Sequence, residues 1–178
     1  MHHRAFALLR RLATLALLSI AGLAACHRGP DYCRGAECAC RGEHDCDVHC
    51  DLPGCDVECA SADTCDVACR DDCNVDCTSL QSCAAECGDG CALTCTSATG
   101  CDFTCGEDCD VRCHDVSSCD ARVGANSQVE CDRLSSCEIE CSGACTLSCN
   151  QVSSCNVRCS PGFVRCEQAG TLRCASQC

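Results

Sequence analysis

Residues 101–118 read CDFTCGEDCDVRCHDVSS, and this 18-residue unit decides how the chain folds. It consists of a C-x-φ-x-C segment, a short spacer, a second C-x-φ-x-C segment and a longer spacer, where φ is apolar. The first cysteine of the unit recurs every 18 residues, at Cys65, Cys83, Cys101, Cys119, Cys137 and Cys155. A period in this range is typical of solenoids, in which each unit buries its inner face only against its neighbours.

The C-x-φ-x-C segments alternate with period two. Their φ residue is apolar in all thirteen segments: Val48, Val57, Val67, Val75, Ala85, Leu93, Phe103, Val111, Ala121, Val129, Ile139, Leu147 and Val157. Most flanking residues are polar or small, so a strand would place both cysteines and φ on one face and the flanking pair on the other. In the longer spacers a small or aliphatic residue recurs, and we predict that it folds inward: Ala62, Leu80, Ala98, Val116, Leu134 and Val152.

A helix is the alternative, because cysteines four residues apart also share a helix face. The φ residue would then lie on the opposite side of the helix, where an apolar residue has no reason to recur. Valine also favours strands, and spacers such as Gly88-Asp89-Gly90 are typical of tight turns. We therefore predict an all-β, disulfide-stapled β-solenoid whose 18-residue coils contain two short strands each.

The cysteine slots also suggest a pairing. Of the 26 slots from Cys46 to Cys159, only Val123 and Ser127 are not cysteine, and they are the second and third slots of one coil. Their joint loss predicts that second and third slots are bonded: Cys50–Cys55, Cys69–Cys73, Cys87–Cys91, Cys105–Cys109 and Cys141–Cys145. First and fourth slots would then pair across the coil: Cys46–Cys59, Cys65–Cys77, Cys83–Cys95, Cys101–Cys113, Cys119–Cys131 and Cys137–Cys149. The partners of Cys33, Cys38, Cys40, Cys155, Cys159, Cys166, Cys174 and Cys178 stay open.

The first 26 residues have the layout of an export signal. Arg4, Arg10 and Arg11 precede an uncharged apolar run over 12–25 that is too short to span a bilayer comfortably. The run ends in Leu23-Ala24-Ala25-Cys26, which resembles the lipobox of bacterial lipoproteins. The resemblance implies a signal helix, cleavage before Cys26 and acylation of that cysteine, and His27 after it resembles an outer-membrane sorting signal. The alternative is an ordinary signal peptide that is cut earlier, which leaves Cys26 free to pair.

The sequence thus divides into a signal peptide (1–25), a tether and N-terminal cap (26–45), the solenoid (46–159) and a C-terminal cap (160–178). Export to an oxidising compartment agrees with the 31 cysteines of the chain. After the signal segment, 10 arginines stand against 26 acidic residues, a formal charge of −16. This acidity argues against a nucleic-acid partner, because phosphates would not be neutralised.

These features predict a non-enzymatic protein of the bacterial cell envelope, in the outer membrane, that presents a structural or binding surface to an unknown protein or glycan. The alternative is metal binding, either by thiols or by calcium on an outward position that stacks from coil to coil. This position carries Asp47, Asp66, Asp102, Asp120, Glu138 and Asn156 and is interrupted by Ala84. No cofactor is predicted otherwise. His27, His44, His49 and His114 lie in no ligand-spaced motif, and no C-x-x-C is present.

Overall fold

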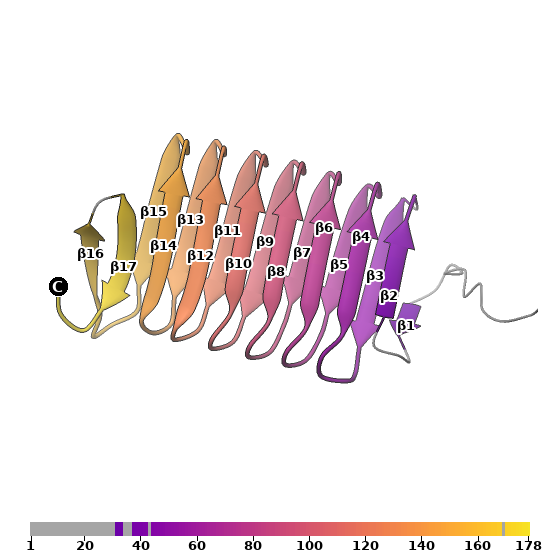
Figure 1. Ribbon diagram of the computed structural model, residues 1–178, viewed down its shortest axis with the longest axis horizontal. Coiled ribbons are helices and arrows are strands. Elements are labelled where there is room, and N and C mark those ends of the chain that lie inside the picture. The colour runs from indigo at the N-terminus through magenta and orange to yellow at the C-terminus, as the bar shows by residue number, and fades with distance from the viewer. Residues whose placement is uncertain (1–30, 34–36, 43, 169) are drawn as a thin grey trace, which may run out of the picture.

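The computed structural model describes residues 31–33, 37–42, 44–168 and 170–178, and within them it is an all-β solenoid of about seven turns. The predicted signal helix and Cys26 lie outside these residues. Odd-numbered strands form one parallel sheet, in the order β1-β3-β5-β7-β9-β11-β13-β15 (Figure 1). Its strands are β1 (Asp31–Cys33), β3 (Asp45–Cys50), β5 (Thr64–Ala68), β7 (Ser82–Glu86), β9 (Gly100–Cys105), β11 (Ser118–Val123), β13 (Ser136–Cys141) and β15 (Ser154–Cys159).

The even-numbered strands form the second sheet, whose order is β16-β17-β14-β12-β10-β8-β6-β4-β2. Its strands are β2 (Glu37–Arg41), β4 (Asp56–Ala60), β6 (Asn74–Thr78), β8 (Ala92–Thr96), β10 (Asp110–His114), β12 (Ser127–Asp132), β14 (Cys145–Asn150), β16 (Val164–Gln168) and β17 (Thr171–Ala175). All thirteen predicted segments are therefore strands. Below, the sheet of odd strands is called sheet A and the other sheet B.

The two ends of the stack differ. At the N-terminal end β1 pairs with β3 and β2 pairs with β4, both in parallel, so the stack begins before Cys46. At the C-terminal end β16 and β17 form an antiparallel hairpin, and β17 pairs with β14 in antiparallel orientation (Figure 1). The hairpin therefore covers the last strand of sheet B and ends its parallel ladder.

The core is a single layer between the sheets. The thirteen φ residues are all buried, and Phe103, Leu93, Val75, Val111 and Leu147 are 0% exposed. The inward residues of the longer spacers are buried as well, from Ala62 to Leu134, and Val152 is half-buried. Each strand thus contributes one apolar side chain and its flanking sulfurs, which confirms the period-two assignment.

Every wide corner from Ser61 to Gln151, and every tight corner from Gly54 to Asn126, passes through a left-handed residue. At the wide corner this residue recurs every 18 positions, with φ between 53° and 59°, at Ser61, Ser79, Ser97, Asp115, Arg133 and Gln151. At the tight corner it is Gly54, Asp72, Gly90, Asp108 and Asn126. Coils also bond to each other at the tight corner, because the Glu107 amide donates to Asp89 Oδ1 at 2.7 Å and the Asp89 amide donates to Asp71 Oδ1 at 3.0 Å.

The bridges at the tight corner agree with the prediction in three coils. Cys50–Cys55, Cys105–Cys109 and Cys141–Cys145 are bonded, with Cα–Cα distances of 6.5, 6.4 and 6.1 Å. The predicted bridges Cys69–Cys73 and Cys87–Cys91 do not form in this structure, so the prediction is wrong for these two coils. Cys69 instead bonds Cys87 of the next coil, at a Cα–Cα distance of 4.8 Å, and Cys73 and Cys91 are buried thiols. A stacked neighbour lies as close as the partner across the turn, so either bond is within reach.

The predicted first-to-fourth pairs are also wrong: Cys46–Cys59, Cys65–Cys77, Cys83–Cys95, Cys101–Cys113, Cys119–Cys131 and Cys137–Cys149. The fourth-slot cysteine bonds the first slot of the next coil, six residues on, across the wide corner. The observed pairs are Cys40–Cys46, Cys59–Cys65, Cys77–Cys83, Cys95–Cys101, Cys113–Cys119, Cys131–Cys137 and Cys149–Cys155, with Cα–Cα distances of 6.3–6.6 Å.

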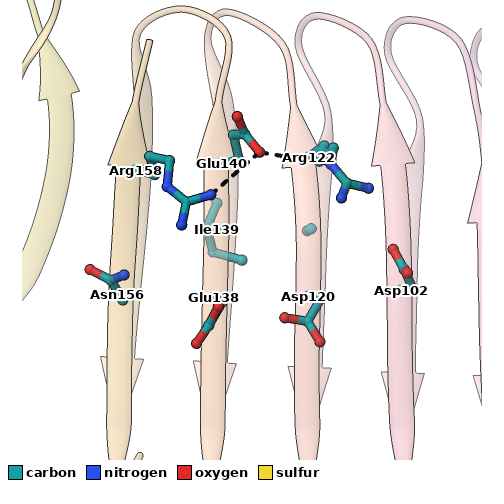
Figure 2. A pocket seen from close by; sticks show the side chains of 9 residues that line it. Asp102, Asp120, Arg122, Glu138, Ile139, Glu140, Asn156 and Arg158 are labelled. Carbon is teal, nitrogen blue, oxygen red and sulfur yellow. Dashed lines mark ion pairs between the residues drawn. The ribbon is translucent and has the colours of Figure 1, made fainter.

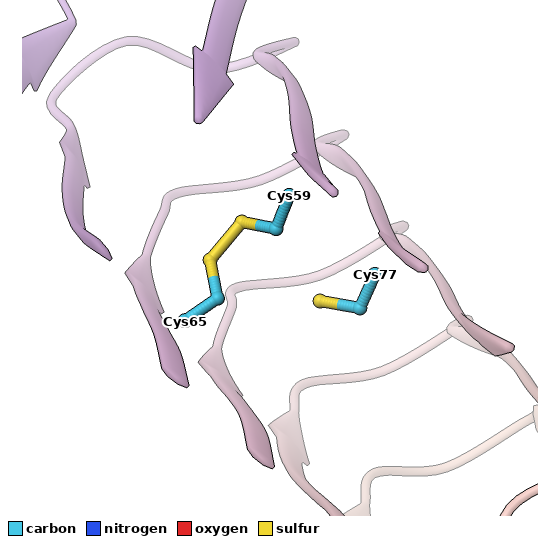
Figure 3. Close-up of side chains that lie close together, drawn as sticks. All are labelled: Cys59, Cys65 and Cys77. Carbon is cyan, nitrogen blue, oxygen red and sulfur yellow. A yellow bond between two sulfur atoms is a disulfide. The ribbon is translucent and has the colours of Figure 1, made fainter. Parts of the chain in front are cut away.

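The reason is the pitch of the solenoid. A strand of sheet B lies half a coil above one strand of sheet A and half a coil below the next, so its cysteine faces two candidate partners. The sulfurs of Cys59, Cys65 and Cys77 all lie within 4.8 Å of one another (Figure 3). The observed pairing bonds all fourteen first-slot and fourth-slot cysteines from Cys40 to Cys155. The predicted pairing would leave Cys40 and Cys155 without a partner. Beyond it, Cys159–Cys174 and Cys166–Cys178 fasten the C-terminal hairpin.

Reduction should unfold the solenoid, because its core holds one apolar side chain per strand and each short loop closed by a bridge contributes about 2–3 kcal/mol. We expect a phosphine reductant without denaturant to abolish the β-type circular dichroism of the purified protein. Mock-treated protein is the control. Retention of the β signal to high temperature after complete reduction would refute the dominant role of the bridges.

Candidate functional site

The most distinctive surface is the outward face of sheet A. The predicted stacking of Asp47, Asp66, Ala84, Asp102, Asp120, Glu138 and Asn156 is confirmed, since these residues are register partners from β3 to β15. Three consecutive coils in this stack carry acids, Asp102, Asp120 and Glu138, which we call the acidic column. All three are exposed, and parallel strands hold them about 4.8 Å apart.

A second column lies beside the first. Two residues further along the same strands stand Arg122, Glu140 and Arg158, which also stack in register. Glu140 Oε2 lies 3.8 Å from Arg122 Nε and 3.9 Å from Arg158 Nη1, so this carboxylate is shared between two guanidinium groups (Figure 2). We call Arg122, Glu140 and Arg158 the Arg/Glu column. Its opposite charges partly neutralise one another.

The acidic column has no such partner. Within the described part of the chain, no basic group lies within 4.0 Å of the carboxylates of Asp102, Asp120 or Glu138. The pKa of Asp120 is raised above its ordinary value, first by partial desolvation and then by repulsion from Glu138 and Asp102, which Arg122 opposes. Negative charge is therefore held here against an electrostatic cost, and a cation placed on the column would relieve it.

The two columns line a shallow, open depression of about 190 Å³. Asn156 lines it at the C-terminal end of the stack (Figure 2). A neighbouring depression of about 290 Å³ lies over β3 to β11, and Asp102 and Arg122 border both. Its floor is formed by small residues such as Ala68 and Ala84, because at these outward positions the coils carry no long side chain. Sheet A thus presents a continuous, gently hollowed face.

Sheet B is acidic too, but its columns are broken. Along one column Asp56 is followed by Asn74 and Ala92, and along the next Asp76 is followed by Thr94 and Arg112. No run of three acids occurs on the strands of sheet B from β4 to β14. The two faces therefore differ in the arrangement of charge more than in its amount.

Of the other sequence candidates, His49 lies on this face, where its Nε2 is 3.1 Å from Asp47 Oδ1, and His114 lies apart from it. Cys113 is bonded to Cys119, so its adjacency to His114 gives no nucleophile and base. His114 instead joins a charged cluster at the wide corner, where its Nδ1 lies 3.0 Å from Asp132 Oδ2 and Arg133 Nε donates to Asp115 Oδ1 at 2.6 Å. The hydrogen bond from Arg133 lowers the pKa of Asp115. Period-18 stacking would have brought Asp115 and Arg133 together, but their side-chain geometry is not readable from the pattern.

Among the residues that the structure describes, three groups of cysteine sulfurs are close enough to hold a metal: Cys59, Cys65 and Cys77; Cys69, Cys87 and Cys91; and Cys141, Cys145 and Cys174. Each group contains a disulfide, and a disulfide sulfur is not the thiolate that soft metals bind. The middle group is different because it also includes a buried thiol, Cys91, with a second one, Cys73, beside it. Sequence reasoning missed this group, since all four cysteines fit the ordinary repeat.

No protein-family model, no curated protein and no solved structure is similar to this chain. The described residues contain no helix of the length and apolarity needed to cross a bilayer.

Replacing Asp120 by Asn should stabilise the protein slightly at neutral pH. The folded-state pKa of Asp120 is raised from 3.8, so its charge destabilises the fold once the pH rises through the folded pKa. We expect D120N to gain about 0.2–0.5 kcal/mol at pH 7 in urea unfolding with the bridges intact, a small value because the group is exposed.

Below pH 3.8 both states of Asp120 are protonated and the gain should vanish. Asp76→Asn on sheet B is the control and should change stability little at either pH. Equal gains for D120N at pH 3 and pH 7 would show that charge repulsion is not the cause.

Proposed function

We propose that this chain is a non-enzymatic, lipid-anchored envelope protein whose sheet A face binds a positively charged segment of an extracytoplasmic protein or glycan. The observation that carries the proposal is the acidic column, three unpaired carboxylates in consecutive coils. The column is rigid, because its strands are hydrogen-bonded on both sides. A disulfide bridges the wide corner before each of β9, β11 and β13, and the tight corners after β9 and β13 are bridged as well. A ligand therefore meets charges that are already arranged, and little ordering entropy opposes binding.

The anchor belongs to the same proposal. The lipobox-like Leu23-Ala24-Ala25-Cys26 would place acyl chains on Cys26, only a few residues before β1. Acyl chains stabilise membrane binding by about 0.8 kcal/mol per buried methylene, so several chains hold a protein without a transmembrane helix. An outer-membrane location outside the reducing cytoplasm also suits a chain with this many bridges.

An organic cation fits the column better than calcium does, although calcium remains the alternative ligand. Calcium takes six to eight oxygen ligands, and proteins often supply some of them as backbone carbonyls. Here the carbonyls of β9, β11 and β13 are engaged in the parallel ladder. Guanidinium or ammonium groups need only one or two carboxylates each, which a row of acids offers.

Neutralising the acidic column should weaken binding of a cationic probe. We expect the triple variant D102N/D120N/E138Q to bind fluorescent deca-arginine about tenfold more weakly than the parent in detergent micelles. The estimate takes three exposed charge pairs at about 0.5 kcal/mol each, and 1.4 kcal/mol is tenfold. Fluorescence anisotropy at low salt measures the difference.

The matched control is D56N/D76N/E130Q, which removes the same charge from exposed positions of sheet B. Equal weakening by both variants would show that net charge alone determines binding of the peptide, and it would refute a specific site on sheet A. The metal-binding alternative would be favoured if the parent bound calcium but not the peptide, and if only the sheet A variant lost calcium binding.

Replacing Cys26 should abolish the lipid. In a bacterial host fed labelled palmitate, we expect the parent to incorporate label and to fractionate with membranes, and C26A to do neither. Cys33→Ala, a nearby cysteine that should not affect acylation, is the control. Label on C26A would refute the lipobox assignment and leave the ordinary signal peptide as the explanation.

A further inference from the structure

Four cysteines at the tight corner of two adjacent coils depart from the pattern of their neighbours. Cys69 and Cys87 are bonded to each other along the stack, and Cys73 and Cys91 are thiols. The bridged corner Cys105–Cys109 in the next coil has the same spacing of four residues. We call these four residues the cysteine quartet.

The quartet is compact. The sulfurs of Cys69, Cys87 and Cys91 lie within 4.8 Å of one another, and the Cys73 amide donates to Cys91 Sγ at 3.3 Å. Each cysteine thus has one partner across the turn and another in the adjacent coil. Cys69 and Cys87 are half-buried, whereas Cys73 and Cys91 are buried. The edge of the quartet is therefore open to a small molecule and its inner pair is not.

We infer that the quartet is a two-electron redox site that exchanges between one bridge, Cys69–Cys87, and two bridges, Cys69–Cys73 and Cys87–Cys91, by reaction with a low-molecular-weight disulfide such as oxidised glutathione. The two-bridge state is the arrangement that Cys50–Cys55, Cys105–Cys109 and Cys141–Cys145 already have. The backbone consequently needs no new geometry to reach it. Neither state involves the acidic column.

The first step is an internal exchange. Cys91 thiolate attacks Cys87 Sγ, the Cys87–Cys91 bond forms, and the bond from Cys87 to Cys69 breaks. Cys69 leaves as a thiolate and takes up the proton that Cys91 lost, so no electrons leave the protein. The step moves a thiol from a buried position to a half-buried one that a small disulfide can reach.

The second step is the oxidation. Cys69 thiolate attacks oxidised glutathione, forms a mixed disulfide and releases one glutathione. Cys73 thiolate then attacks Cys69 Sγ, which forms Cys69–Cys73 and releases the second glutathione. Two protein thiols have lost two electrons and two protons, which the two glutathione molecules carry away.

Burial makes the first step slow. It is the largest cause that raises the pKa of Cys91, to about 11, and the neighbouring Cys73 raises it further, while a backbone hydrogen bond from Cys73 opposes the shift. Since only the thiolate attacks, the rate should rise about tenfold per pH unit between pH 7 and pH 9. The one-bridge state therefore persists until an alkaline pH or a long exposure allows exchange.

The test equilibrates the full chain in detergent with glutathione mixtures from reducing to oxidising, blocks thiols with N-ethylmaleimide and maps peptides. Cleavage before Asp71, Asp76 and Asp89 separates all four cysteines of the quartet. We expect Cys69–Cys87 with two blocked thiols in reducing mixtures. In oxidising mixtures we expect Cys69–Cys73 and Cys87–Cys91, loss of two thiols and release of two glutathione molecules per chain. Cys50–Cys55 should stay intact throughout.

Cys91→Ser is the matched variant, because Ser127 occupies the same slot one coil beyond Cys109 and its Oγ accepts from the Cys109 amide at 3.1 Å. The variant should fold, keep Cys69–Cys87 in every mixture and form no second bridge. An unchanged quartet in the parent across all mixtures would overturn the inference. So would oxidation that adds a Cys73–Cys91 bridge while Cys69–Cys87 remains.

Discussion

The disulfide across the wide corner is the constraint on which the rest of the structure depends. It joins the end of a sheet B strand to the start of the next sheet A strand, and it recurs in seven successive turns from Cys40–Cys46 to Cys149–Cys155. Between the sheets there is room for only one apolar side chain per strand, and most of these are Val or Ala. Hydrophobic burial of this size would not hold two sheets together over such a length, so covalent bonds replace it.

The same constraint gives the outer face its properties. Because the coils are bridged on the inside, their outward side chains cannot separate to relieve repulsion. Asp102, Asp120 and Glu138 consequently stay one strand apart, and their repulsion adds to partial desolvation, the larger cause, in raising the pKa of Asp120. A flexible loop with the same charges would spread them and lose both the repulsion and the prearranged row. The rigidity of the core and the fixed row of charges on the surface therefore have one cause.

Much of this follows from the sequence, because period two and period 18 are both geometric. Period two places Cys and φ on the inner face, and period 18 places Asp102, Asp120 and Glu138 in one column. The pairing of Cys59 did not follow, since half a coil of pitch makes Cys46 and Cys65 near-equivalent partners. That ambiguity is settled only at the ends, by Cys40, which lies outside the 26 slots, and by Cys155, for which the slot pattern suggested no partner.

The coil that lacks cysteine at the tight corner explains why the cysteine quartet can serve chemistry. Val123 fills the second slot and is 2% exposed, and Ser127 fills the third and is 1% exposed. Ser127 accepts from the Cys109 amide as Cys91 accepts from the Cys73 amide, so an oxygen and a sulfur fill the same acceptor role at these two corners. The second slot needs only apolar volume. The corner with Val123 and Ser127 keeps its fold without any disulfide, so stacking of the coils does not depend on a particular bridge at the tight corner. The bridge of the quartet can therefore change partners while the coils stay stacked.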